Sequence, residues 1–135
     1  AAAMELPDGT IVTGKTFNLL GSSAALILNA VKALGNIGHE VHLIAPSAIE
    51  PIQKLKVNYL GSKNPRLHTD EVLIALSMCA ATDPTAQNAL NQLSKLKGCQ
   101  VHTSVMLSDV DINVFKKLGV DLTSEPVYEE RKIYH

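Results

Sequence analysis

Apolar residues recur along this chain with two different spacings, and the elements they predict alternate between strands and helices. Apolar or β-branched runs predict strands at Thr10–Gly14, Glu40–Ile44, Val101–Leu107 and Val120–Leu122. Apolar positions at helical spacing, bounded by capping residues, predict helices at Ser23–Leu34, Ser47–Gly61, Asp70–Ala81, Pro84–Lys97 and Ser108–Leu118. This order predicts the α/β class, as a three-layer α/β/α domain with a small, mainly parallel sheet of about four strands.

Two of the predicted helices are apolar on almost every side, Ser23–Leu34 and Asp70–Ala81. Such helices are typical of buried positions, because each apolar face is stabilised only when another element covers it. In so small a domain, this predicts cover by another domain or a second subunit. The expected partners are therefore an N-terminal region of the same protein and further copies in a homo-oligomer.

The length of 135 residues fits one domain. Three alanines precede Met4, so we expect residues 1–8 to be a cloning remnant or a linker outside the fold. Residues 9–126 are expected to form a single α/β domain, as the C-terminal fragment of a longer protein. Residues 127–135 are polar and weakly patterned, which predicts a C-terminal tail.

The charge balance argues against two classes of partner. The net charge is -1 and the isoelectric point is about 6.6, so no overall positive field would attract nucleic acid or an anionic membrane. No apolar run approaches the ~20 residues that a membrane-spanning helix requires. Cys79 and Cys99 are expected to be free thiols, which favours a reducing, cytoplasmic setting.

Gly9, Gly14, Lys15 and Thr16 have the spacing G-x-x-x-x-G-K-T of a phosphate-binding P-loop. A P-loop follows a buried strand and leads directly into a helix, so that backbone N–H groups converge on the phosphate. Here the β-branched run Thr10–Thr13 lies inside the spacing, and helical sequence begins only after a further loop. The sequence therefore favours a turn and a strand over a nucleotide-binding loop.

The loop after this strand nevertheless offers groups that suit an anion such as phosphate or carboxylate. Ligands of such sheets bind outside the carboxyl ends of the strands, where this loop is predicted to lie. The candidate anion-binding residues are Lys15, Thr16, Asn18, Ser22, Ser23, Lys63 and Arg66. The alternative is a capped helix with a solvated lysine, and a solvated loop for Lys63 and Arg66.

His68 and Asp70 form a weaker candidate pair that would orient a ligand or exchange a proton. The alternative is a helix cap with favourable charges at the positive end of the helix dipole, and Asp70 is expected to pair with Arg66 or Lys63. No metal site is predicted, because no H-E-x-x-H or cysteine pair completes a coordination sphere. The sequence indicates no cofactor. It also has no G-x-S-x-G elbow, which would mark a nucleophilic serine. Whether the protein is an enzyme is therefore left open.

Four segments carry a resemblance to a known family: Gly9–Thr16, Ile49–Gln53, Tyr59–Leu76 and Leu118–Val120. They closely resemble the C-terminal part of domain-of-unknown-function family 1846, also called uncharacterised protein family 0371. The resemblance implies an α/β fold, a longer bacterial protein in the cytosol, and self-association. It implies no established activity. Some relatives have carried an ATP-dependent peptidase label, for which this chain shows neither P-loop context nor a zinc-protease helix.

Two functions follow from the sequence. The first is a domain that contributes part of a cleft for an anionic small molecule, with the N-terminal region of the protein supplying the rest. The alternative is a structural or oligomerisation domain without a ligand site of its own.

Overall fold

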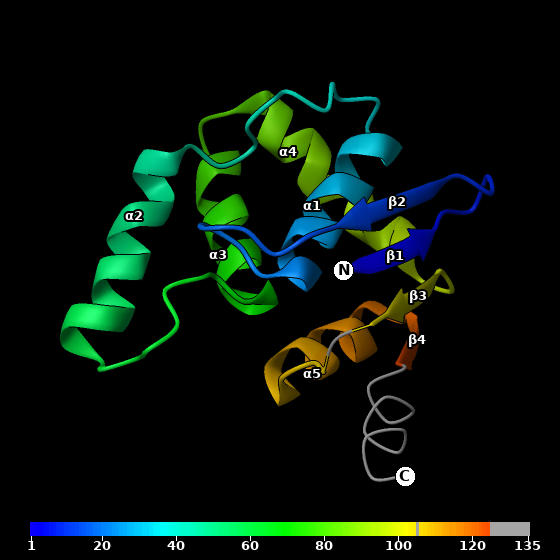
Figure 1. Ribbon diagram of the computed structural model, residues 1–135. Helices are drawn as coiled ribbons and strands as arrows, with labels where there is room; N and C mark the ends of the chain where they lie inside the picture. Colours follow the sequence, from blue (N-terminus) through cyan, green and yellow to red (C-terminus); the bar gives the residue numbers. More distant parts are fainter. Residues whose placement is uncertain (105, 125–135) are drawn as a thin grey trace, which may run out of the picture.

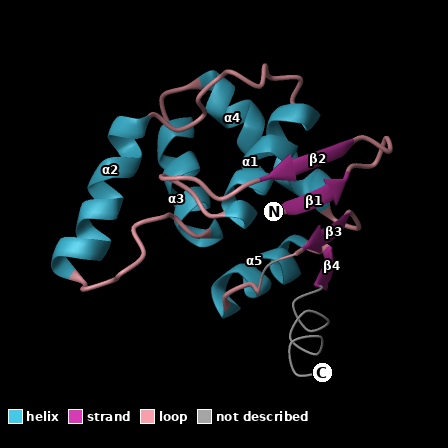
Figure 2. Cartoon of the chain, viewed as in Figure 1, coloured by secondary structure: helices cyan, strands magenta, loops and turns pink. Residues whose placement is uncertain are grey.

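Four short strands and a set of helices make up the fold in the computed structural model, which describes residues 1–104 and 106–124 (Figures 1 and 2). The strands are β1 (Ala2–Glu5), β2 (Ile11–Gly14), β3 (Gln100–Thr103) and β4 (Asp121–Ser124). The helices are α1 (Ser22–Leu34), α2 (Pro46–Lys54), the π-helix η1 (Leu55–Tyr59), α3 (Thr69–Ala80), α4 (Pro84–Asn91), the 3-10 helix η2 (Gln92–Leu96) and α5 (Asp109–Leu118). The predicted α/β class is confirmed. The predicted domain end at residue 126 and the tail 127–135 lie outside the described residues.

The sheet is mixed, with the strand order β2-β1-β3-β4. Strand β1 pairs antiparallel with β2 and with β3, whereas β3 and β4 pair in parallel. The prediction of a mainly parallel sheet is therefore wrong. The reason is a hairpin: β1 and β2 are joined by a tight turn around Pro7–Gly9, and a connection this short can link only antiparallel strands.

Strand β1 comes from residues that the sequence analysis placed outside the fold. Ala2–Glu5 lies between β2 and β3, and Ala2, Met4 and Leu6 are buried. An interior strand has hydrogen-bonding partners on both sides, so its backbone is satisfied even where its residues favour strands weakly. Alanine is such a residue, which explains why the pattern predicts no strand here.

Burial alternates along the strands, which shows that one face of the sheet is covered and the other is exposed. The covered face carries the cross-strand row Val12, Met4, Val101 and Leu122. The exposed face carries the neighbouring row Ile11, Glu5, Gln100 and Asp121. A sheet with antiparallel pairs tolerates such a solvated face. Among the described residues, therefore, the second helical layer of the expected three-layer arrangement is not seen.

Helix α1 forms the centre of the core. Its buried residues are Ser22, Ser23, Ala24, Ala25, Leu26, Ile27, Leu28, Ala30 and Val31. The elements packed around it include β1, β2, α3 and α4, and Figure 1 shows it between the hairpin and the other helices. Its apolar sides are thus covered within the domain, so α1 itself requires no outside partner.

Strand β2 ends in close contact with the backbone of α1. A Cβ atom added to Gly14 would lie 2.5 Å from the carbonyl oxygen of Ser22 and closer still to the backbone nitrogen of Leu26. No side chain fits in this space, so the position requires glycine. The contact fixes the direction in which the chain leaves β2 and enters the loop at Lys15.

The segment Glu40–Ile44 is not a strand, so this prediction is wrong. The chain follows turns and bends here, yet Leu43 and Ile44 are buried. At the neighbouring edge of the sheet, the carbonyl oxygen of Thr13 accepts a hydrogen bond from Asn29 Nδ2 at 2.8 Å. The apolar pattern thus reports burial correctly, but side-chain packing and not strand pairing produces that burial.

The predicted helices are present, and α4 and α5 begin at the expected capping residues, whereas α1 and α2 begin after Gly21 and Ala45 without a side-chain cap. Asp83 caps α4 by accepting a hydrogen bond from the backbone of Thr85 at 2.9 Å, and Ser108 caps α5 in the same way. Gly119 ends α5 with a φ of 78°. The helix predicted to close at Gly61 consists of α2 followed by η1, and Figure 1 shows α2 at the side of the molecule away from the sheet. Within the described residues, no helix has the length and apolar character needed to cross a membrane.

Replacing Gly14 by alanine is expected to lower the free energy of unfolding by about 2 kcal/mol, because the added methyl group must displace the backbone of α1. Urea unfolding followed by circular dichroism measures this change. Gly21→Ala is the matched control, since a Cβ at Gly21 would have its nearest neighbour, the carbonyl oxygen of Leu67, at 3.8 Å. Its expected cost is below about 1 kcal/mol. Equal unfolding free energies for the two variants would contradict the close contact.

Candidate anion-binding site

The P-loop-like spacing is divided between the two ends of β2. Gly9 lies in the hairpin turn with a φ of 87°, where its N–H donates to the carbonyl oxygen of Leu6 at 2.9 Å. In the same turn, hydrogen bonds from Thr10 lower the pKa of the exposed Asp8 carboxyl. Residues 11–14 then form the strand, so Gly9 and Lys15 cannot cradle one phosphate. The interpretation of this segment as a turn and a strand is confirmed.

The loop from Lys15 to Gly21 is held in place by the segment before α3. Leu67 bridges it from the side: its N–H donates to the carbonyl oxygen of Leu19 at 3.0 Å, and its own carbonyl accepts from the N–H of Gly21 at 3.2 Å. Arg66 Nε donates to the carbonyl oxygen of Phe17 at 2.6 Å. The guanidinium of Arg66 therefore supports the backbone of the loop.

The other candidates in and near this loop have different surroundings. Ser22 and Ser23 are buried in the first turn of α1, and the hydroxyl of Ser23 has no hydrogen-bond partner among the described residues. Thr16 and Asn18 are exposed, and the backbone carbonyl of Asn18 accepts a hydrogen bond from Gln53 of α2 at 3.0 Å. Lys63 is exposed in the loop before α3.

His68 and Asp70 lie at the start of α3, where a neighbouring residue forms the ion pair. Glu71 Oε1 lies 2.8 Å from Lys56 Nζ and also accepts the backbone N–H of His68 at 2.8 Å. Asp70 is exposed, and its carboxylate accepts the N–H of Glu71. The expected pairing of Asp70 with Arg66 or Lys63 is therefore replaced by an ion pair between Lys56 and Glu71. Lys56 reaches the Glu71 carboxylate from η1, and its side chain is only 8% exposed.

A cavity of about 400 Å³ lies beside α1 and next to the end of β2. Its basic and polar lining residues are Thr13, Lys15, Asn29, Lys32, His39 and His42. Its apolar lining residues are Phe17, Leu19, Leu20, Ala25, Leu28, Leu43, Ile44, Pro46 and Ile49. Lys15 is the one residue of the sequence-based candidate set that lines this cavity.

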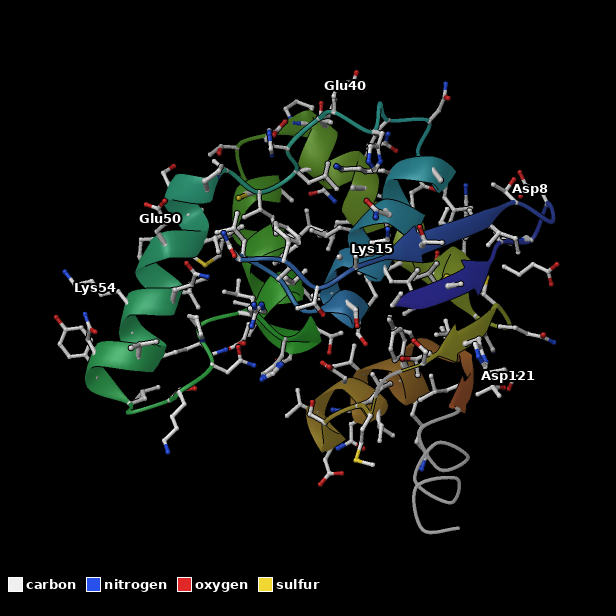
Figure 3. The ribbon with its side chains drawn as sticks, viewed as in Figure 1. Asp8, Lys15, Glu40, Glu50, Lys54 and Asp121 are labelled. Atoms are coloured by element: carbon white, nitrogen blue, oxygen red, sulfur yellow. The ribbon has the colours of Figure 1, made fainter. Side chains whose placement is uncertain are left out.

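The electrostatics of the cavity favour negative charge. Two lysines and two histidines line it, and no carboxylate from the described residues does so. Burial lowers the pKa of Lys32, an effect that the nearby carboxylate of Glu40 opposes. Figure 3 shows Glu40 and Glu50 at the outer edge of the molecule, and Lys15 where β2 meets α1. Lysine ammonium groups and histidine N–H groups in such a setting bind phosphate or carboxylate oxygens through charge-assisted hydrogen bonds.

Two hydrogen bonds hold the basic part of the cavity in shape. Lys32 Nζ donates to the carbonyl oxygen of His39 at 3.1 Å, which ties α1 to the irregular segment that follows it. Asn29 Nδ2 donates to the carbonyl oxygen of Thr13, which ties α1 to β2. Lys32 has further N–H groups beyond this one bond, and these remain available to a ligand.

Other chemistries have less support in this part of the molecule. Within the described residues, no three side chains of histidine, cysteine, aspartate or glutamate gather closely enough to hold a metal ion. Cys79 and Cys99 are free. Burial, with a contribution from Glu5, raises the pKa of the Cys99 thiol and so disfavours the nucleophilic thiolate.

The sequence analysis did not select Lys32, His39 or His42 as ligand-binding residues. His42 was assigned to a predicted strand, and Lys32 was counted only as part of a helix. The sequence does contain one signal for Lys32. One face of α1 carries, at helical spacing, Ala25, Leu28, Asn29 and Lys32. Along this face the residues change from apolar to polar.

The fold and the cavity define a small α/β domain with a basic cavity beside an edge strand. The model of the family described as domain of unknown function DUF1846, C-terminal, matches residues 1–134, and the chain belongs to this family. UPF0371 proteins of Corynebacterium urealyticum and Corynebacterium diphtheriae are 57% and 56% identical over 98% of the chain. A UPF0371 protein of Streptococcus pyogenes is 52% identical over 99% of it.

These comparisons confirm the resemblance drawn from the sequence, and the relatives named are bacterial. The match covers 27% of each of these relatives. The chain therefore spans about a quarter of the length of the curated relatives it matches. The matched range of the family model includes the three alanines before Met4, and two of them, Ala2 and Ala3, belong to β1.

Replacing Lys56 by methionine is expected to lower the free energy of unfolding by about 2 kcal/mol. The substitution removes the cation from the Glu71 carboxylate and a donor from the carbonyl oxygen of Arg66, which Lys56 Nζ contacts at 2.6 Å. We expect less than for a fully buried pair, because the Glu71 side chain is 24% exposed. Thermal and urea unfolding measure the change. Lys54→Met, at an exposed lysine of α2, is the control, and equal effects of both substitutions would contradict a structural role for the pair.

Proposed function

We propose that this domain contributes part of a cleft that binds an anionic small molecule bearing phosphate or carboxylate. The observation that carries the proposal is the lining of the cavity beside α1, where Lys15, Lys32, His39 and His42 come together without a lining carboxylate. The net charge of the protein is -1, so this local excess of basic groups does not reflect the composition. A site of this kind stabilises a ligand by neutralising its charge.

Burial makes Lys32 the central residue of the proposed site. A partly buried ammonium group has lost hydration, and for this reason the pKa of Lys32 is lowered. A bound anion would restore the lost interactions and raise that pKa again. The hydrogen bond from Lys32 to the backbone of His39 already directs the ammonium group toward the segment that closes the cavity. Binding then costs less side-chain conformational entropy, because the Lys32 side chain is already held in place.

The remaining sequence-based candidates belong to the surroundings of the proposed site. Lys15 is shared by the candidate set and the cavity, and Arg66 supports the loop in which Lys15 lies. Thr16, Asn18 and Lys63 are exposed, where an N-terminal region of the protein would complete the cleft. A cytoplasmic location is part of the same proposal, and the two free cysteines are consistent with a reducing compartment.

Lys32→Gln is expected to weaken the binding of inorganic phosphate about tenfold, because a charge-assisted hydrogen bond to the ligand is lost. The dissociation constant is measured by titration with ¹H–¹⁵N correlation spectra. In the wild-type protein, the largest shifts are expected at the backbone amides of Lys15, Asn29 and Lys32. Lys116→Gln is the matched control, since Lys116 is exposed on α5 and lies outside the cavity lining.

A pH series completes this test. Because burial lowers the pKa of Lys32, this side chain loses its charge at lower pH than a solvated lysine. Binding to the wild-type protein should therefore already weaken as the pH rises toward the ordinary pKa of lysine, about 10.4, and Lys32→Gln should show a smaller change over the same range. If phosphate shifts no amide around the cavity, or if Lys116→Gln has the larger effect, the proposed site is wrong.

A second candidate function is supported by a different observation, the exposed large apolar residues of η1, of the residue that follows it, and of α3. Tyr59 and Leu60, at the end of η1, are 72% and 71% exposed, and Met78 of α3 is 71% exposed. Leu55, Val57 and Ile74 add to the apolar surface of these elements. Concentrations of exposed apolar residues are typical of protein interfaces. We propose that this surface contributes to a homo-oligomer, as the alternative to a ligand site.

Replacing both Tyr59 and Leu60 by serine is expected to reduce self-association, because these two side chains offer the most exposed apolar surface of η1 and its end. Sedimentation equilibrium compares the mass with the 14.5 kDa of one chain. Ile11→Ser is the control, since Ile11 is also exposed, 58%, but lies on the open face of the sheet. A wild-type chain that sediments as a monomer at all concentrations would remove the case for this alternative.

A further inference from the structure

The character of the proposed site changes along the axis of α1. Ala25 and Leu28 line the cavity in one turn of the helix, and Asn29 and Lys32 line it in the next. With a rise of 1.5 Å per residue, Ala25 and Lys32 lie about 10 Å apart along the axis. On α1, the cavity lining is therefore apolar toward the start of the helix, and polar and positively charged toward its end.

The elements opposite α1 follow the same division. At the end of α1, Lys32 contacts the backbone of His39 at 3.1 Å, so His39 lies in the polar part. At the start of α1, the preceding loop is tied to α2 through the bond from Gln53 to the carbonyl of Asn18. Helix α2 thus brings Ile49, a buried side chain of the cavity lining, toward the apolar part. Phe17, in the same loop, adds an aromatic ring that is partly exposed.

We infer that the ligand of this site is an amphipathic organic anion, with one phosphate or carboxylate group held near Asn29, Lys32 and His39 and an apolar body on Phe17, Leu28 and Ile49. This inference rests on the proposed function and specifies it. A compact inorganic anion would leave the apolar part of the cavity unfilled, and an uncharged apolar compound would bring no negative charge to the basic residues of the lining. An organic anion shorter than about 10 Å satisfies both parts.

Four probes test the inference: phenyl phosphate, inorganic phosphate, benzyl alcohol and phenylacetate. Phenyl phosphate is expected to bind about tenfold more tightly than inorganic phosphate, because the ring leaves water for the apolar part. Benzyl alcohol, which lacks the charge, is expected to bind more weakly than phenyl phosphate. Phenylacetate, the anion of phenylacetic acid, serves as the carboxylate counterpart and shows which anionic group is preferred. Calorimetry or amide shift titration measures all four.

Two variants separate the two parts of the cavity. Phe17→Ser should weaken phenyl phosphate several-fold and leave inorganic phosphate unchanged, whereas Lys32→Gln should weaken both. Phe17 is 46% exposed and the bond from Arg66 reaches its backbone, so the substitution leaves the fold intact. Equal affinity for phenyl phosphate and inorganic phosphate, or an equal loss of both in Phe17→Ser, would overturn the inference while the anion site stands. Absence of binding by every anion would overturn the proposed function itself.

Discussion

The close contact between the end of β2 and the first turns of α1 is the constraint on which the rest of the arrangement depends. Gly14 allows the strand to reach the helix backbone at Ser22 and Leu26, and any side chain there would separate the two elements. With the hairpin held against α1, the covered face of the sheet and the buried side of α1 form one core. The same contact places Lys15 at the edge of the cavity. The contact also explains part of the P-loop-like spacing, because Gly14, the second glycine of that spacing, is needed for close packing against α1.

Much of the fold could be predicted from the sequence where local chemistry decides the structure. The helices begin at capping residues such as Asp83 and Ser108 and end near glycines such as Gly119, and these signals act over a few residues. Strand β1 could not be predicted in this way, since its stability comes from partners on both sides and not from its own residues. The antiparallel pairs of the sheet both involve β1, so without β1 the sheet was wrongly predicted to be mainly parallel.

The site was predictable only in part, because it depends on residues that lie far apart in the sequence. Lys15 follows a strand and precedes a helix, which is a local signal for ligand binding. Lys32 and His39 come together in the cavity lining because of the path that the chain follows after α1. This path is irregular. The segment Glu40–Ile44 shows the same limit: its apolar residues are buried as the pattern indicates, but the partner that buries them could not be read from the pattern.

The starts of α1 and α3, the two helices that flank the predicted anion-binding loop, are not open to an anion. An anion commonly binds at a helix N-terminus, where free N–H groups face it. Here the start of α3 is occupied, because Asp111 accepts hydrogen bonds from the backbone N–H and the hydroxyl of Thr69 at 3.1 and 2.8 Å. The start of α1 is buried, with Ser22 and Ser23 in the core. Of the basic residues that line the cavity, Lys32 lies further along α1, and His39 and His42 lie in the segment after it, so they face a ligand from the side of the helix.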